Sequence, residues 1–87
     1  MSNEAFIEKA KSIVREYSTT FVTKAEPNSE FEVFVVWNAY ILGNIKALLS
    51  TTLYDGMYYE VTYNKAKGEI YFDAYKKAEK LTVYVKE

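Results

Sequence analysis

The beginning of the chain alternates apolar and polar residues with the period of an α-helix. Apolar side chains recur every three or four positions and form one stripe, which consists of Phe6, Ile7, Ala10, Ile13, Val14, Tyr17 and Phe21. Ser2 or Asn3 can cap the start of this helix, and Glu4 in the first turn complements the helix dipole. Because β-branched residues become frequent after Ser18, the pattern predicts an amphipathic helix at about residues 3–20.

The rest of the chain carries runs of strand length separated by turn signals. These runs lie at about residues 31–38, 45–53, 57–64, 69–75 and 80–86, and the segment Lys24–Glu30, which holds the single proline, is predicted to be a loop. Gly43, Gly56 and Gly68 fall between the runs, as in hairpin turns. The sequence therefore predicts one α+β domain over residues 1–87. In it, one N-terminal amphipathic helix packs on a five-stranded antiparallel β-meander.

Turn length and alternation also predict which residues face each other across the strands. The expected pairs are Leu53 with Met57, Thr51 with Tyr59, Leu49 with Val61, Tyr63 with Ile70, Val61 with Phe72, Tyr59 with Ala74, Phe72 with Val83 and Ile70 with Val85. One face then collects most of the apolar side chains and is expected to lie under the helix. It comprises Phe31, Val33, Val35, Trp37, Ala47, Leu49, Val61, Ile70, Phe72, Leu81, Val83 and Val85. Trp37 is accordingly predicted to be a core residue.

The opposite face of the predicted sheet mixes aromatic and polar residues, and no second helix is available to cover it. It comprises Phe34, Val36, Leu48, Tyr58, Tyr71, Tyr75 and Tyr84, with Ser50, Thr52, Glu60, Thr62, Asp73 and Thr82 among them. The predicted pairing places Glu60 directly opposite Asp73, with Ser50 on the far side of Glu60. Like charges in such positions destabilise a sheet, and a local inconsistency of this kind is typical of a functional site.

Composition excludes several classes of chemistry. The 87 residues contain no cysteine and no histidine, so thiol nucleophiles, disulfides, Cys/His zinc sites and imidazole bases are absent. Eleven basic residues against 12 acidic ones give a net charge of −1, which argues against general nucleic-acid binding. No apolar run approaches the length of a membrane span, and no targeting segment is visible, so the cytoplasm is the expected location.

The acidic pair and the tyrosines are the candidate binding groups. Glu60 and Asp73 can bind amines, hydroxyls or a partner's basic side chain, unless the register is shifted or Lys46 and Lys76 neutralise them. A carboxylate pair can also serve a glycosidase, but a small sheet without an evident cleft does not favour one. Tyrosine is enriched at interfaces and can also stack on a nucleobase. The candidate binding residues are Ser50, Tyr58, Glu60, Tyr71, Asp73, Tyr75 and Tyr84, and no catalytic residue, metal site or cofactor is expected.

The middle of the chain resembles a known family. Residues 46–53 (KALLSTTL) and 55–64 (DGMYYEVTYN) are similar to a family of small uncharacterised phage and prophage proteins of Gram-positive bacteria. Val35-Val36-Trp37 before them, with Glu69-Ile70-Tyr71 and 73–77 (DAYKK) after them, fit the same pattern. The resemblance covers about residues 31–77. It implies a phage genome context and a domain of unknown function, so it transfers no catalytic residue.

Together these observations predict a non-enzymatic phage or prophage accessory protein. It is expected to bind and modulate a host protein, such as a defence component, through the Tyr-rich sheet face. The alternative is an oligomer that binds or sequesters a nucleotide signal, with Lys46, Lys76 or Lys77 meeting phosphate. A homo-oligomer is a further expectation, since several exposed aromatic residues together are unusual for a monomer. Neither a membrane nor nucleic acid in general is an expected partner.

Overall fold

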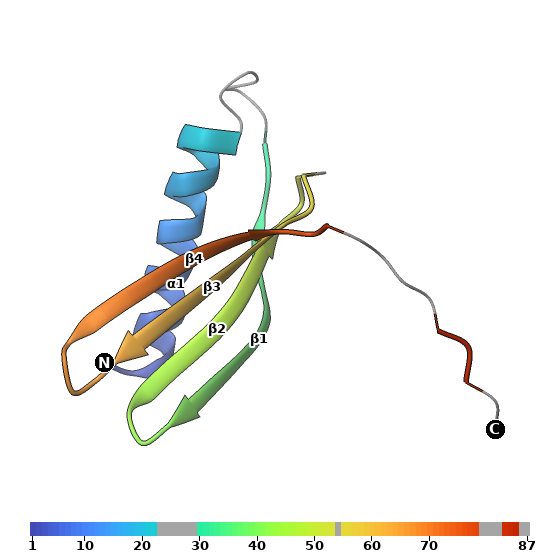
Figure 1. The fold of residues 1–87 in the computed structure, drawn as a ribbon. Helices are drawn as coiled ribbons and strands as arrows, with labels where there is room; N and C mark the ends of the chain where they lie inside the picture. The colour runs from blue at the N-terminus through green and yellow to red at the C-terminus, as the bar shows by residue number, and fades with distance from the viewer. Residues whose placement is uncertain (23–29, 54, 79–82, 86–87) are drawn as a thin grey trace.

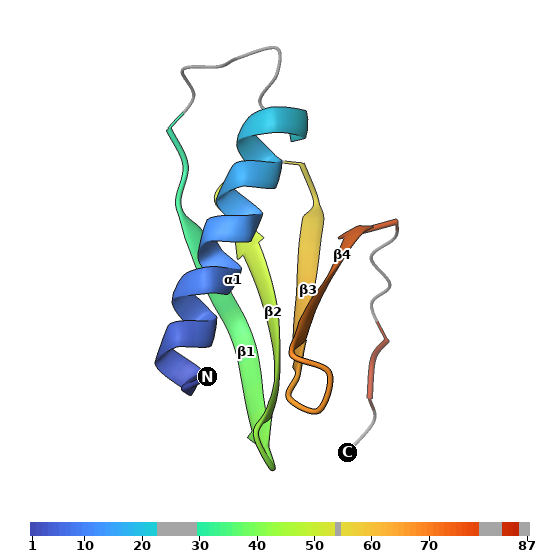
Figure 2. The same ribbon diagram turned by 90° about the vertical axis from the view of Figure 1, so that its left-hand side faces the viewer.

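The computed structural model describes residues 1–22, 30–53, 55–78 and 83–85. An N-terminal helix, α1 (Asn3–Tyr17), continues into a π-helical turn, η1 (Ser18–Val22). Four strands follow, β1 (Val33–Ile41), β2 (Asn44–Thr51), β3 (Met57–Asn64) and β4 (Glu69–Lys76). They form one antiparallel sheet in the order β1-β2-β3-β4, with α1 across one face (Figures 1 and 2). The predicted α+β class, with one helix on an antiparallel sheet, is confirmed.

The helix is fixed at its start by a cap and along its length by packing. The Ser2 side chain accepts a hydrogen bond from the Ala5 backbone N–H at 3.0 Å, which satisfies one of the free donors of the first turn. Phe6, Ala10 and Val14 are completely buried against the sheet. The α-helix ends at Tyr17, three residues earlier than predicted, where the chain widens into η1.

The β3–β4 hairpin has the predicted register. Val61 lies opposite Phe72, Tyr63 opposite Ile70 and Glu60 opposite Asp73. The turn is held locally, because the Gly68 N–H donates to the Asn64 carbonyl at 2.8 Å and Gly68 has a φ of +64°. A short turn with a glycine in the left-handed region leaves one register, so the sequence signal was sufficient here.

Between β2 and β3 the predicted register is wrong by two residues. Leu49 lies opposite Tyr59 rather than Val61, and β2 ends at Thr51 rather than at residue 53. Side-chain hydroxyls replace the expected ladder: Thr51 Oγ1 accepts from the Leu53 N–H, and Thr52 Oγ1 accepts from the Glu32 N–H. A shift of two preserves the alternation, so each residue of β2 keeps its predicted face.

Trp37 is not a core residue, which contradicts its predicted place under the helix. Val35 lies opposite Leu49, but Trp37 lies opposite Leu48, so Val36 is an extra, unpaired residue in β1. This β-bulge reverses the alternation beyond it. Trp37 therefore faces away from α1 and is 44% exposed, while Asn38 faces the helix and donates to Asn3 Oδ1 at 2.6 Å. Strand β1 also continues to Ile41, beyond the predicted end at residue 38.

The sheet has four strands rather than five within the part of the chain that is described. Of the predicted strand at 80–86, only Val83, Tyr84 and Val85 are described, and they belong to no strand. All three side chains are exposed, so the predicted pairs Phe72 with Val83 and Ile70 with Val85 are wrong within one chain. Leu81 and Thr82, which were assigned to the two faces of this strand, lie outside the described residues. Strand β4 is therefore an edge of the described sheet.

Tyr59 is the largest side chain that the fold buries completely, although the sequence did not assign it to the core. Its ring stacks on Phe72 at 5.7 Å and meets Tyr17 edge-on at 5.6 Å. The buried apolar residues between α1 and the sheet are Phe6, Ala10, Val14, Phe31, Val33, Ile45, Ala47, Leu49, Tyr59 and Val61. The face of the sheet that points away from α1, the outer face, is left without a second layer among the described elements.

Candidate functional site

The outer face is an array of side chains in three rows, each crossing all four strands. The row nearest the β2–β3 turn consists of Phe34, Ser50, Tyr58 and Tyr75. The middle row consists of Trp37, Leu48, Glu60 and Asp73. The third row consists of Ala39, Lys46, Thr62 and Tyr71. Six of the seven candidate binding residues, all except Tyr84, thus lie on one face.

The middle row contains the acidic pair. Glu60 and Asp73 are direct cross-strand neighbours, as the sequence indicated. Lys46 lies beside Glu60, with 3.4 Å between Lys46 Nζ and Glu60 Oε1. Within the described residues, Asp73 makes no ion pair, and its side chain is exposed. The face therefore presents one neutralised carboxylate and one that is free to meet a cation.

Ser50 has a different neighbourhood from the one predicted. Because of the two-residue shift, Leu48 and not Ser50 lies beyond Glu60, and Ser50 lies opposite Tyr58. The Ser50 hydroxyl donates to the Met57 carbonyl at 2.9 Å, and the residue is buried. Ser50 therefore holds β2 against β3 and offers little surface to a ligand.

The tyrosines are divided between the two ends of the outer face. Tyr58 and Tyr75 are direct neighbours in the first row, and Tyr71 lies in the third row, beyond Asp73. The Tyr71 hydroxyl donates to Glu69 Oε2 at 2.6 Å, and this hydrogen bond to the carboxylate raises the pKa of Tyr71. Tyr84 lies on no strand and is 92% exposed, so it is not part of the outer face of its own chain.

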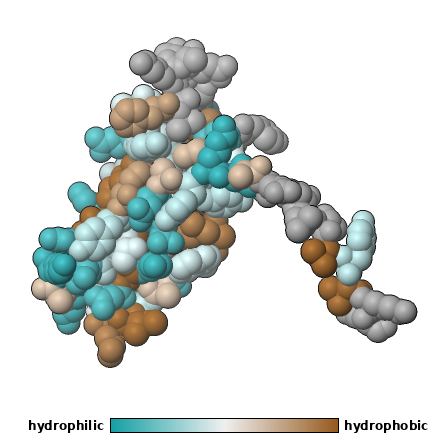
Figure 3. All heavy atoms as spheres, in the orientation of Figure 1, coloured by the Kyte–Doolittle hydropathy of each residue, from teal (hydrophilic) through white to brown (hydrophobic). Residues whose placement is uncertain are grey.

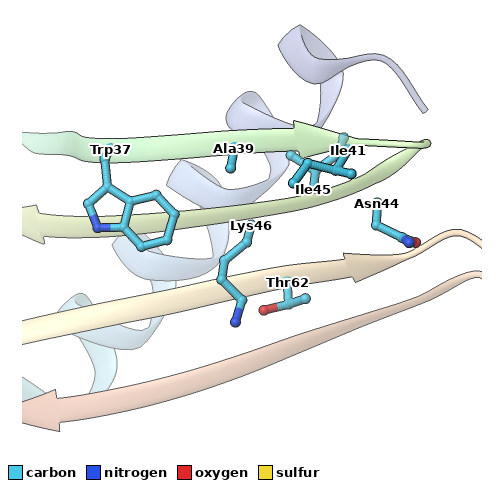
Figure 4. Close-up of a pocket in the computed structure, with 7 residues that line it drawn as sticks. All are labelled: Trp37, Ala39, Ile41, Asn44, Ile45, Lys46 and Thr62. Carbon is cyan, nitrogen blue, oxygen red and sulfur yellow. The ribbon is translucent and has the colours of Figure 1, made fainter.

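The structure adds an apolar half to the face, along β1. Trp37, Phe34 and Ile41 are large exposed side chains that contact solvent on this side, and Leu48 lies beside Trp37. A hollow of about 270 Å³ lies between Trp37 and Ile41 and extends toward β3 (Figure 4). Its lining consists of Trp37, Ala39, Ile41, Asn44, Ile45, Lys46 and Thr62. Figure 4 shows Trp37 and Lys46 reaching over this part of the sheet.

Sequence reasoning missed Trp37 because the run Val33–Trp37 is apolar at every position. Period-two alternation cannot reveal a change of phase in a strand whose residues are all apolar. The available signal was Asn38, since a polar side chain is a poor neighbour for the core unless it has a hydrogen-bond partner. It has one in Asn3, at the start of α1.

A second hollow, of about 380 Å³, lies at the opposite end of the face, beside the β2–β3 turn. Phe34, Tyr58, Lys77 and Asp55 are among its lining residues. Asp55 Oδ1 accepts from the Met57 N–H at 3.0 Å, and Oδ2 is buried without a hydrogen-bond partner in the described residues. A carboxylate and an ammonium group thus share this end of the face.

Within the described residues, the outer face divides into an apolar part and a polar part. Over residues 1–22, 30–53, 55–78 and 83–85, no three acidic side chains gather in a way that could hold a metal ion. The outer face instead combines an apolar strip on β1 and β2 with carboxylates and phenols on β3 and β4. Such a surface suits a partner that is itself amphipathic.

Comparison with known proteins identifies a family but no activity. The model of a family of unknown function (DUF6275) matches residues 7–85 of the chain. No curated protein and no solved structure matches the chain. The expected membership of a family without an assigned function is confirmed. Among the described helices, none is both long and apolar enough to span a membrane.

Proposed function

We propose the following function from the geometry of the site. The chain belongs to DUF6275, a family of unknown function, so the family itself suggests no activity. The protein is a non-enzymatic binding module that docks on another protein through the outer face of its sheet. In the phage or prophage setting that the resemblance implies, it is an accessory protein and its partner is a host protein. A component of a host defence system is the first candidate, and binding would inhibit it.

The single observation that carries this proposal is the uncovered apolar strip of the outer face. Phe34, Val36, Trp37 and Ile41 are between 44% and 67% exposed, and no described element packs over them. Contiguous exposed apolar surface is unusual in a soluble monomer and is typical of an interaction site. Tryptophan and tyrosine are also the residues that most often contribute large shares of binding energy.

The charges of the face indicate the chemistry of the partner. Asp73, which makes no ion pair in the described structure, lies in the same row as Trp37. A partner that inserts an apolar side chain beside Trp37 can therefore place a lysine or arginine near Asp73. A pair of complementary charges on the two proteins guides the orientation of the complex and speeds its formation. An amphipathic, basic segment of the partner is the expected ligand.

Binding of a nucleotide signal, the alternative expectation, receives less support from the geometry. Lys46 is engaged by Glu60, and Lys76 lies opposite Met57, on the side of the sheet that faces α1. Lys77 lines the hollow beside Tyr58, but the buried carboxylate oxygen of Asp55 lies in the same hollow. A phosphate there would meet a negative charge as well as a positive one.

A capture experiment with matched variants tests the proposal. The wild-type protein, Trp37→Ser, Asp73→Lys and Glu8→Lys are each immobilised and exposed to the same host lysate. Glu8→Lys makes the same charge change as Asp73→Lys on an exposed position of α1 and serves as the control. The proposal expects one host protein to be retained by the wild type and by the control and to be lost from both outer-face variants.

Direct titration with the purified partner then separates the two functions. Trp37 is the only tryptophan of the chain, so binding at the outer face should change its fluorescence. The partner in this titration is labelled or lacks tryptophan, so that the signal of Trp37 can be followed separately. A host protein that binds both outer-face variants as tightly as the wild type would contradict the proposal. A nucleotide that binds with micromolar affinity in calorimetry, with no captured protein, would favour the alternative.

A further inference from the structure

The side of β4 that faces the helix is incompletely covered. Helix α1 packs against β1, β2 and β3, and Figure 2 shows β4 to one side of it. Ile70 and Phe72 point to the helix side of β4 but remain only half-buried, and Ala74 is exposed. Because β4 is an edge of the described sheet, its outward backbone groups can pair with a further strand.

A groove lies beside this edge, between the end of the helix and β4. It has a volume of about 330 Å³ and is lined by Ile13, Glu16, Tyr17, Thr20, Phe21 and Phe72. Tyr17 contacts both Phe21 and Phe72, with ring centroids 5.0 and 5.2 Å apart. Phe21 is nevertheless 67% exposed, although the sequence placed it in the buried stripe of the helix. The groove is thus an unfinished part of the hydrophobic core.

The described C-terminal segment, Val83–Val85, exposes apolar side chains of the kind that could fill this groove. Val83, Tyr84 and Val85 are three consecutive large apolar residues, each at least 73% exposed. Figure 1 shows this segment apart from the sheet, and Figure 3 shows hydrophobic surface in the same place. Their order matches the two faces of β4, because two valines would share one face of a strand and the tyrosine would take the other.

In the register that places Val83 opposite Phe72, the same chain has no favourable turn to bring this segment back to its own β4. Pairing Val83 with Phe72 and Val85 with Ile70 would leave Lys77 and Ala78 as a two-residue turn. Such hairpin turns require positive φ at one or both central residues, which favours glycine or asparagine. Lys77 and Ala78 both have negative φ, and the Lys77 N–H continues the ladder by donating to the Gly56 carbonyl at 2.7 Å. A strained hinge of this length favours exchange between copies.

We propose that Val83–Val85 of a second copy adds to β4 as the fifth strand, and that the exchange is reciprocal in a two-fold dimer. Val83 and Val85 then cover Phe72 and Ile70 and close the groove at Phe21. Tyr84 of the second copy lies beside Tyr71 and extends the outer face. This inference does not depend on the proposed function, because the groove lies on the helix side of the sheet.

Disulfide capture tests the exchange cleanly, since the chain has no cysteine of its own. Tyr71→Cys in an untagged chain and Tyr84→Cys in a tagged chain are co-expressed and then oxidised. The proposal expects a cross-linked heterodimer on a non-reducing gel. In the control, Tyr75→Cys replaces Tyr71→Cys. That position is four residues away along β4, beyond the reach of a disulfide, so little heterodimer is expected.

The oligomeric state and a double variant complete the test. Light scattering should give twice the monomer mass for the wild type and the monomer mass for Val83→Asp, with unchanged circular dichroism. A wild-type protein that is monomeric at the concentrations used would overturn the proposal. A chain carrying both Tyr71→Cys and Tyr84→Cys that forms only an intramolecular disulfide would also overturn it, because the segment would then pair within one copy.

Discussion

At the scale of single residues, Tyr59 shows how the fold accommodates a polar group in its core. Its side chain is completely buried, and the Ser18 hydroxyl donates to Tyr59 Oη at 3.4 Å. Burial raises the pKa of Tyr59 above its ordinary value of 10.0, while the hydrogen bond from Ser18 opposes this shift and the nearby Asp55 carboxylate adds to it. The neutral phenol is therefore the form that the folded protein prefers.

Tyr59→Phe should lower the free energy of unfolding near neutral pH by about 1 kcal/mol, because the buried Ser18 hydroxyl loses a partner. The substitution should also change how the free energy of unfolding depends on pH in the alkaline range. A raised folded-state pKa means that stability is intact below the unfolded value near 10 and falls as the pH rises through the folded value. The variant should lack this part of the loss in urea unfolding between about pH 9 and 11.

Tyr75→Phe is the matched control, since it removes an exposed phenol from the outer face. It should leave the unfolding free energy near its wild-type value across the same range. If Tyr59→Phe followed the same alkaline curve as the wild type, the phenol of Tyr59 would not be held in its neutral form by the core.

At the scale of elements, the sequence predicted a strand register correctly only where local interactions determine that register. The β3–β4 hairpin followed from its alternation and from Gly68, so the sequence predicted the opposition of Glu60 and Asp73. In the β2–β3 hairpin the error was the end of β2: the strand ends at Thr51, and Thr52 bonds to Glu32, 20 positions away, a contact that no local pattern reveals. The bulge at Val36 lies in a fully apolar run, so Trp37 was assigned to the wrong face and half of the candidate site was missed.

The β1–β2 hairpin shows a turn with an unfavourable residue. Leu42 has a φ of +53° and Gly43 a φ of +84°, so both turn residues are in the left-handed region. A leucine there costs on the order of 1 kcal/mol relative to residues that tolerate this conformation. Leu42 is also 90% exposed, and hydrophobic atoms cover this tip of the molecule in Figure 3. It contributes little packing that could offset the strain.

Leu42→Asn should therefore stabilise the protein by about 0.5–1 kcal/mol, because asparagine tolerates positive φ. Leu42→Val should destabilise it, because a β-branched side chain is strained most in this region. The midpoints of guanidinium unfolding, at unchanged slope, measure both effects. Equal midpoints for the two variants would show that strain at position 42 does not limit the stability of the hairpin.

At the scale of the whole molecule, two surfaces of the sheet are left uncovered for the same reason. One helix covers the inner side of β1, β2 and β3, so both the outer face and the helix side of β4 lack a second layer among the described residues. The two surfaces differ in character. The groove beside β4 is apolar and matches the chain's own C-terminal segment, whereas the outer face is amphipathic and carries an acidic pair. This difference supports separate occupants, a second copy for the groove and another protein for the outer face.

The acidic pair should make the isolated protein less stable than its fold allows. Glu60 and Asp73 oppose each other directly, and Lys46 pairs with Glu60 alone among the described residues. Asp73→Asn should raise the free energy of unfolding by about 0.2–1 kcal/mol, and added salt should shrink the gain because it screens the repulsion in the wild type. Glu8→Gln, which removes an exposed carboxylate from α1, should change stability much less. An Asp73→Asn protein no more stable than the wild type would mean that the pair carries no strain. An Asp73→Asn protein that is more stable but binds its partner more weakly would show that Asp73 lowers the stability of the fold and serves binding.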